Sequence, residues 1–395
     1  MSELVVADPR DDADFEAFVR ADVQSFGASP DRIHRWVAAA RPHVRFRFAR
    51  VGDEVVGGYG LMPMGQFYGG RSVPAQGVLA VVVSPMWRRR GAAGAMMRDL
   101  VAICRENNTA VAPLYAATVR LYRRWGWEVA DRAVDHTVRT DALVQLRGEG
   151  APVDAPPVAA LEALRRSYLP AWDGPLDRPD CWLAVEGMSD EPKEHSFLYG
   201  WEENGRLTGF VRYRYGTSSG NDQRVIVDEI HATTLNATHG LLGLLGANES
   251  IYPEVVFHMC LGARSDLLYI LSDASKSVRT EGHLCWMQRI VNVPAALQAR
   301  GWASHVAHRL ELEVADPALD TTERLTVEFN DESALVNPGG AGHVRCSVGA
   351  LSAWYAGTLR AQDAARLQLM SGPPDDLAAM DALIGGRPTW MADHF

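Results

Sequence analysis

The sequence lacks the long apolar run of a membrane span and the features of a signal peptide. Its apolar runs, such as VLAVVV, are the length of a strand, far short of the roughly 20 residues that span a bilayer. The opening MSELVVADPRDDADFEAF is acidic and has no basic stretch followed by an apolar one. We therefore expect no signal peptide and no membrane partner.

Cysteine is scarce, and its residues are scattered without the paired spacing of a metal site. An odd count in a chain without a visible export signal predicts reduced thiols and a cytoplasmic location. His305 and His308 are spaced H-x-x-H, which misses the i,i+4 spacing of helical metal ligands, and no acidic partner accompanies them. We therefore expect no metal. The five cysteines are Cys104, Cys181, Cys260, Cys285 and Cys346.

Positively charged residues are also fewer than negatively charged ones. The chain has 39 lysines and arginines against 49 aspartates and glutamates, which leaves a net charge of −10. This charge argues against a nucleic-acid partner and is compatible with a cationic one. At 395 residues the chain exceeds what one hydrophobic core usually serves, so we expect two or three domains. Apolar content of 47% and charged content of 22% are typical of a soluble globular protein.

The first 140 or so residues predict a mixed α/β arrangement. DADFEAFVRADVQSFG has helical spacing, and Ser29 or Asp31 offers a start for a second helix. Val44, Phe46 and Phe48 alternate with arginines before a Gly-Asp turn, which predicts an antiparallel hairpin. AQGVLAVVVSP is nearly continuous in apolar residues, so we expect a central strand there.

A weaker copy of this order begins about 150 residues downstream, a period that indicates a duplicated domain rather than a solenoid. Residues 197–216 predict a hairpin around an Asn-Gly turn. RVIVDEIHATT predicts a buried strand, and NATHGLLGLLGANES the start of a helix. Where the first copy has WRRRGAAG, the second has TLNATHG, so only the first keeps a basic turn.

The last part of the chain predicts a third, α+β domain that starts near Asn292. Short strands separated by polar turns come first, and GALSAWYAGTLRAQDAARL then has helical spacing. The chain closes with GRPTWMADHF, whose apolar residues predict a docked rather than a frayed end. The expected segments are 1–150, 151–291 and 292–395.

The stretch WRRRGAAGAMM, residues 87 to 97, lies between the central strand and a helix. Backbone N–H groups at a helix start have no internal partners and carry the positive end of the helix dipole. Glycine and small residues let a ligand approach that backbone, so phosphate oxygens fit there. A solvated basic helix start is the alternative. The strand before the turn and the helix after it favour the phosphate site.

Arg88, Gly91 and Ala93 have the spacing R-x-x-G-x-G/A, which resembles the pyrophosphate-binding signature of the GNAT acyltransferase superfamily. The resemblance implies acetyl-CoA as cosubstrate. It implies that backbone groups of Val81 and Val83 bind the pantetheine arm, although both valines could serve core packing alone. The residues of the turn that would bind the pyrophosphate are Arg88, Arg89, Arg90, Gly91, Ala92 and Ala93.

Acetyl transfer to an amine requires two proton movements. An alkyl ammonium with a pKa of about 10.4 must lose a proton, at a cost of roughly 4–5 kcal/mol at neutral pH. The leaving CoA thiolate is stabilised when an acid protonates its sulfur. AVAPLYAA predicts a further strand, and TVRLYRRWGWEVA a short helix stopped by Gly126. In the GNAT superfamily the acid is often a tyrosine of this segment, which is Tyr122 here; a half-buried structural tyrosine is the alternative.

Over the whole chain, the sequence resembles the Eis (enhanced intracellular survival) family of bacterial N-acetyltransferases. The resemblance rests on AVVVSPMWRRRGAAGAMM, LYRRWGWEVA, MQRIVNVPAAL and the final aromatic residue. It implies tandem GNAT domains, the second degenerate and unable to bind CoA, followed by an α+β domain like sterol carrier protein. It implies that the α-carboxylate of Phe395 is the general base and Tyr122 the general acid. It also implies a hexamer and cationic acceptors such as aminoglycosides or polyamines, with Trp36 and Asp393 as pocket residues.

Three functions remain open at this point. The first is an N-acetyltransferase acting on small cationic amines by direct transfer in a ternary complex, since no cysteine lies near the motif as an acyl carrier. The second keeps the enzyme but makes the acceptor a lysine of a protein or peptide. The third is a non-catalytic protein whose last domain binds a lipid or apolar ligand. Loss of the basic turn from only one copy favours an enzyme.

Overall fold

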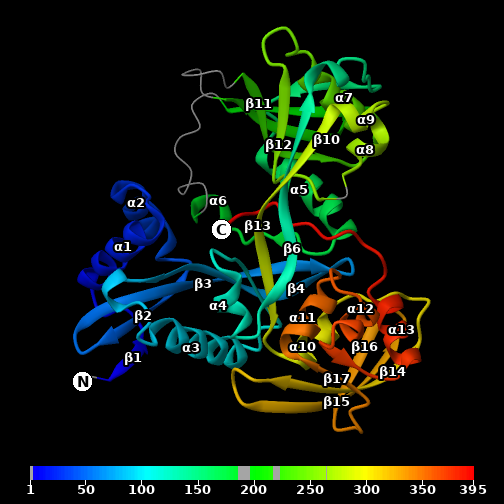
Figure 1. Cartoon of the computed structure of the whole chain (residues 1–395). Helices are drawn as coiled ribbons and strands as arrows, with labels where there is room; N and C mark the ends of the chain where they lie inside the picture. Colours follow the sequence, from blue (N-terminus) through cyan, green and yellow to red (C-terminus); the bar gives the residue numbers. More distant parts are fainter. Residues whose placement is uncertain (1–2, 186–195, 217–222, 264) are drawn as a thin grey trace.

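A computed structural model describes residues 3–185, 196–216, 223–263 and 265–395 (Figure 1). A 13-stranded sheet runs through the first two thirds of the chain in the order β1-β2-β3-β4-β5-β13-β6-β12-β11-β10-β9-β7, with β8 paired to β3. A separate five-stranded sheet follows, in the order β16-β15-β14-β17-β18. The mixed α/β architecture expected from the sequence is confirmed. No helix of the described residues is both long enough and apolar enough to cross a membrane.

The first part of the chain has the predicted helices and hairpin. Asp11 caps the first helix by accepting from the N–H of Asp14, and Gly27 ends it at φ 72°. Of the two candidate starts for the second helix, Ser29 is the N-cap and accepts from the N–H of Arg32. The elements are β1 (Leu4–Ala7), α1 (Asp12–Phe26), α2 (Pro30–Ala40), β2 (Arg45–Val51), β3 (Glu54–Tyr68), β4 (Arg71–Val83), α3 (Ala92–Glu106), β5 (Val111–Tyr115), α4 (Val119–Arg123) and β6 (Glu128–Arg139).

The second part repeats this order. The hairpin of β9 and β10 turns at Asn204 and Gly205, both at positive φ, as the Asn-Gly signal predicts. The elements are β7 (Ala151–Asp154), α5 (Val158–Tyr168), β8 (Leu176–Asp177), α6 (Trp182–Val185), β9 (Ser196–Glu203), β10 (Arg206–Tyr215), β11 (Arg224–Ala232), α7 (Leu235–Gly246), β12 (Glu254–His258), α8 (Leu267–Ile270), α9 (Ala274–Ser277) and β13 (Val278–Ile290).

The two copies exchange their long strands. β13, at the end of the second copy, pairs with β5 and β6 of the first, and β6 in turn pairs with β12. Both long strands run between the two halves of the sheet (Figure 1). Because each half is completed by a strand of the other, the two copies share one continuous sheet.

The third part packs helices against its own sheet. The helical pattern predicted across residues 349–367 forms two helices, because Gly357 at φ 88° interrupts the run. The elements are α10 (Val293–Ala299), β14 (His308–Asp316), β15 (Thr321–Asn330), β16 (Ser333–Pro338), β17 (Val344–Ser347), α11 (Val348–Tyr355), α12 (Ala361–Arg366), β18 (Met370–Ser371) and α13 (Pro374–Leu383).

A buried ion pair joins the parts. Arg300 and Asp173, both fully buried, lie 2.7 Å apart, and Arg300 also donates to the backbone carbonyl of Tyr355. The other carboxylate oxygen of Asp173 accepts from the N–H of Gly69 at 2.7 Å. Removing one partner of such a pair leaves an uncompensated charge at a cost of about 3–5 kcal/mol. The pair therefore holds the third part, the β3–β4 turn and the segment before β8 in one arrangement.

Candidate active site

The start of α3 presents open backbone donors. Gly91 is the N-cap at φ 92°, and no side chain caps the helix. Arg89 is also at positive φ, 62°, so the turn bends sharply just before the helix. Arg88 and Arg90 are exposed beside it: Arg88 donates to Val83 O at 3.3 Å, and Arg90 lies over the Trp87 ring. The predicted basic turn therefore combines free N–H groups with three exposed guanidinium groups.

β4 and β5 diverge next to this turn. Their parallel register joins Ala75 to Val111, and β4 then continues to Val83 without further pairing to β5 among the described residues. On its other edge, β4 carries a bulge against β3, where Ala80 adopts φ 45°. Backbone groups of this part of β4, which includes Val81, therefore face a gap between strands rather than a hydrogen-bonded neighbour.

Tyr122 lies on the α3 side of the sheet. It is 6% exposed on α4 and packs edge-on against Trp127 with ring centroids 6.1 Å apart. It shares one hydrophobic cluster with Val81 and Val83. Burial raises the pKa of the Tyr122 phenol to about 12. The phenol therefore stays protonated at neutral pH, as an acid must.

Phe395 lies where β4 and β5 separate. Its ring meets the rings of Tyr115, at the end of β5, and Trp182, on α6, edge-on, with both centroid distances 6.2 Å. A Cβ at Gly77 of β4 would lie only 3.1 Å from the Phe395 ring, so glycine leaves room for this contact. The predicted docked end is confirmed, since Trp390, Met391 and Asp393 are 5%, 2% and 5% exposed.

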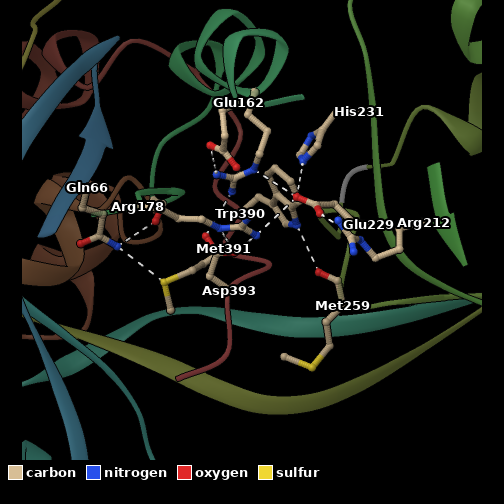
Figure 2. Close-up of polar contacts among 12 residues, drawn as sticks. Gln66, Glu162, Arg178, Arg212, Glu229, His231, Met259, Trp390, Met391 and Asp393 are labelled. Carbon is tan, nitrogen blue, oxygen red and sulfur yellow. Dashed lines mark hydrogen bonds and ion pairs between the residues drawn. The ribbon is translucent and has the colours of Figure 1, made fainter. Parts of the chain in front are cut away.

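A charged cluster holds the tail in place (Figure 2). Asp393 accepts from Arg178 at 2.5 and 3.0 Å and from Arg165 at 3.4 Å. The same arginines lie 3.3 and 3.1 Å from Glu229 of β11. Although burial opposes it, the charges of Arg178 and Arg165 and the hydrogen bond of His231 hold the pKa of Glu229 well below its usual range. We define the tail clamp as Asp393, Arg178, Arg165, Glu229 and His231.

Further hydrogen bonds fix the backbone of the tail. Tyr115 donates its hydroxyl to the carbonyl of Met391 at 2.8 Å, and Thr389 donates to Asp131 at 2.5 Å. The indole N–H of Trp390 reaches the carbonyl of Met259, just after β12, at 3.3 Å. The last residues of the chain are therefore attached to both copies of the duplicated unit.

The two residues expected to contact the acceptor have other surroundings. Trp36 is 7% exposed and packs edge-on against Phe46, 5.9 Å away, in the core beneath α2. Asp393 has its carboxylate occupied by the arginines of the tail clamp. The sequence did not indicate these partners, because Arg165 and Arg178 lie far from Asp393 along the chain. The roles of Trp36 and Asp393 as acceptor contacts stay predictions.

Asp22 is an acid that the sequence analysis missed. It lies on the inward face of α1, 4% exposed, four residues after Phe18. Burial raises its pKa to about 6, although Arg32 opposes the shift. A buried carboxylate with a raised pKa is a candidate functional group. Asp22 follows Val19 by three residues and Phe18 by four, which places an acid on an apolar helix face. This spacing was the signal in the sequence that could have identified it.

Three family models together cover most of the chain. Two, each described as an acetyltransferase (GNAT) domain, match residues 8–130 and 174–290. A third, described as a sterol carrier protein domain, matches residues 293–392. The fold class predicted from the sequence, two GNAT domains followed by a sterol-carrier-type domain, is therefore confirmed.

Curated relatives and a solved structure agree with this organisation. An uncharacterized N-acetyltransferase of Streptomyces avermitilis is 28% identical over 83% of this chain and 82% of its own length. The N-acetyltransferase Eis of Mycobacterium tuberculosis is 28% identical over 78% of each chain. The crystal structure of a GCN5-related N-acetyltransferase from Anabaena variabilis has the same fold, with a TM-score of 0.91 over the full length of both chains at 22% identity. The chain is an Eis-like member of the GNAT family and an N-acetyltransferase.

Proposed function

We propose that this enzyme transfers the acetyl group of acetyl-CoA to a primary amine of a small cationic molecule, such as an aminoglycoside or a polyamine. The position of the last residue is the observation that carries the proposal. Phe395 packs against Gly77 and Tyr115, at the gap between β4 and β5, and the open start of α3 follows β4. A donor bound at the turn and an acceptor beside Phe395 would meet in that gap.

On the donor side, we propose that the backbone amides from Arg89 to Ala93 bind the pyrophosphate of acetyl-CoA. Arg88, Arg89 and Arg90 would supply positive charge, and Gly91 and Ala92 would leave room for the phosphates. Backbone groups of Val81 and Val83 would bind the pantetheine arm along the unpaired edge of β4. The absence of a side-chain cap at Gly91 supports this assignment, because the N–H groups there need an acceptor.

For the chemistry, we propose direct transfer in a ternary complex. The acceptor ammonium gives one proton to the α-carboxylate of Phe395, and the free amine attacks the thioester carbonyl. The new C–N bond forms, the C–S bond breaks, and the leaving thiolate takes its proton from Tyr122. The second proton of the attacking nitrogen and the proton on the carboxylate leave to solvent, and solvent reprotonates the phenol, so each ammonium acetylated releases one proton overall.

For the acceptor side, we propose Asp22 as the acidic residue that pairs with a cationic substrate. A bound ammonium would compensate the cost of an ionised carboxylate in that buried position. We assign Asp393 a positioning role, in which its pairing with Arg178 and Arg165 holds the carboxylate of Phe395 in place. Asp393→Asn should then lower kcat for the acceptor and leave the Kd of CoA unchanged.

The remaining finer points are also proposals. We propose domain boundaries at residues 1–150, 151–291 and 292–395, with β13 crossing from the second domain into the sheet of the first. A cytoplasmic location and a hexameric assembly remain expectations from the sequence and its resemblance. Limited proteolysis and light scattering of the purified chain measure the boundaries and the assembly.

The test follows thiol release from acetyl-CoA against polyamines, aminoglycosides and lysine peptides. Deleting Phe395 removes the ring and moves the free α-carboxylate back to His394, whereas a Gly-Ser extension keeps the ring and moves the free carboxylate away. We expect both variants to lose roughly 10²–10⁴-fold in kcat and to retain CoA binding. Phe395→Leu, which keeps the carboxylate in place, is the matched control and should retain kcat within about tenfold. An extended chain as active as the parent would contradict the proposal.

A further inference from the structure

Three potential metal ligands that do not belong to the tail clamp meet on the sheet. Among the described residues, Asp135, His258 and His283 form a group whose ligand atoms all lie within 4.8 Å of one another. Nδ1 of His258 lies 3.0 Å from one carboxylate oxygen of Asp135, and Nε2 of His283 lies 2.8 Å from the other. Both imidazoles therefore direct a ring nitrogen toward the same carboxylate.

The sheet topology brings these residues together. β6 lies between β12 and β13, and the register pairs His258 directly with Asp135. On the other side, the register of β13 shifts between Gly282 and Cys285, and His283 lies within that irregularity. Such a bulge re-aims a side chain. Because the three ligands come from three strands, no sequence spacing indicates them, which is why the sequence analysis predicted no metal.

The carboxylate is also held in place by the backbone. The N–H of Met259, which adopts φ 54°, donates to Asp135 at 3.0 Å. The Asp135 side chain is 17% exposed, while His258 and His283 are 45% and 38% exposed. A fixed, half-buried carboxylate beside two accessible imidazoles leaves the group reachable from solvent.

We propose that Asp135, His258 and His283 bind one divalent transition-metal ion of the zinc type, with the remaining position open to water. Two imidazole nitrogens and a carboxylate oxygen suit Zn²⁺, whose bonds to such atoms are about 2.0–2.2 Å long. Tetrahedral ligands at that length lie roughly 3.3–3.6 Å apart, so the present separations of 2.8 and 3.0 Å need to open only slightly.

The proposed ion would link three neighbouring strands of the sheet. It would join the end of β12, at His258, to β6 and β13. The next residue, Met259, accepts the indole N–H of Trp390 at its carbonyl. One nearby cation opposes binding: Arg132 lies along Gly282 and donates Nε to the backbone carbonyl of His283 at 3.2 Å. The alternative is a simple hydrogen-bonded cluster, in which Asp135 only orders two histidines.

The experiment uses the full-length chain without an affinity tag, stripped of metal and kept reduced. ZnCl₂ is titrated by calorimetry near neutral pH, and we expect one ion per chain. His258→Gln and His283→Gln should each weaken binding at least about tenfold. Binding should also weaken at about pH 5.5, because a protonated imidazole cannot bind a metal. Co²⁺ bound in place of zinc should give the intense visible absorption of tetrahedral coordination.

Two control variants separate this site from other zinc-binding groups. His308→Gln removes a histidine that pairs with Asp376 at 2.8 Å, and Cys285→Ser removes a nearby thiol. Neither change should alter the affinity for zinc. The proposal is overturned if the parent chain shows no saturable binding, or if neither His258→Gln nor His283→Gln weakens it. Circular dichroism of both variants ensures that a loss of affinity does not come from unfolding.

Discussion

The two GNAT units of this chain differ most at the start of the helix that follows their central strand. In the first unit, α3 begins at Gly91 with no side-chain cap and three arginines before it. In the second, Thr234 caps α7 by accepting from the N–H of Ala237 at 3.0 Å. The hydroxyl of Thr234 donates to Glu203, which also accepts from Thr208 at 2.6 Å. We call the uncapped start of α3 open and the capped start of α7 closed.

At the closed start, a side chain of the second unit takes the place of an anion. The hydroxyls of Thr208 and Thr234 hold the pKa of Glu203 below its usual range, and the N–H of Ala237 contributes. A carboxylate of the chain itself therefore lies at the helix end where an anion would bind. The same fold can thus have an uncapped or a capped helix start at this position, and a few side chains at one turn decide which.

The helices that precede the two hairpins show a second contrast. α5 of the second unit buries Arg165, which is 4% exposed and already paired with Asp393 and Glu229. α1 of the first unit buries Asp22, whose pKa is raised to about 6. The chain itself compensates the buried charge of the second unit. In the first unit, burial destabilises the ionised carboxylate of Asp22, and a bound cation would offset that cost.

Among the contrasts between the two units, the largest effect should come from removing the hydroxyl of Tyr122, the proposed acid of the first unit. In Tyr122→Phe, no phenol remains to protonate the leaving thiolate, so kcat should fall roughly 10²–10³-fold. The Kd of CoA should stay the same. Tyr215→Phe in the second unit is the matched control, because it removes only a hydroxyl bonded to Asn248 at 2.9 Å. Steady-state thiol release and calorimetry with CoA measure both quantities, and equal kcat values would reject Tyr122 as the acid.

A smaller but still large effect should follow when the open turn loses its charge. Changing Arg88, Arg89 and Arg90 together to Gln should raise the Kd of CoA about 100-fold, equivalent to about 3 kcal/mol. The remaining affinity should depend less on salt, because fewer charges contact the phosphates. Arg206→Gln, in the exposed hairpin of the second unit, serves as control and should leave the Kd unchanged. If the triple variant binds CoA as tightly as the parent, the turn is only a solvated helix start.

Local signals in the sequence predicted local structure well. The cap at Ser29 and the Asn204-Gly205 hairpin each depend on chemistry within a few residues. The position of β13 between β5 and β6 was not predictable in this way, because strand order depends on contacts between distant segments.

The site shows the same limit. The basic turn before α3 was visible in the sequence, since a strand, a glycine and a helix lie in direct succession. The surroundings of Asp393 were not, because its arginine partners come from the second unit. Asp22 lay within reach of the helical periodicity, but the spacing alone does not show how deeply its carboxylate is buried.

An intermediate effect on stability should appear at the buried acid of α1. A carboxyl whose pKa rises on folding, here from 3.8 to about 6, destabilises the folded state once the pH passes through that range. Asp22→Asn should therefore stabilise the chain by about 3 kcal/mol at pH 8 and by only about 0.5 kcal/mol near pH 4. Urea unfolding at the two pH values measures this, with the exposed Asp12→Asn on the same helix as control.

The same substitution separates stability from function at Asp22. If the carboxylate pairs with the acceptor, Asp22→Asn should raise KM for a cationic amine while the fold becomes more stable at pH 8. A variant with unchanged KM would limit Asp22 to a structural role. A variant less stable than the parent at pH 8 would instead mean that the ionised carboxylate has a favourable partner in the fold.

The smallest effect should come from opening the closed helix start. Thr234→Ala removes the cap of α7 and should cost about 1 kcal/mol of the free energy of unfolding. Thr118→Ala is a matched control, since Thr118 is the N-cap of α4 but makes no capping hydrogen bond, and it should cost less. Calorimetry should still find one CoA per chain in Thr234→Ala, because Glu203 remains and no arginines precede the helix. A second bound CoA would mean that the cap alone separates the two units, and that the arginines matter less than the open N–H groups.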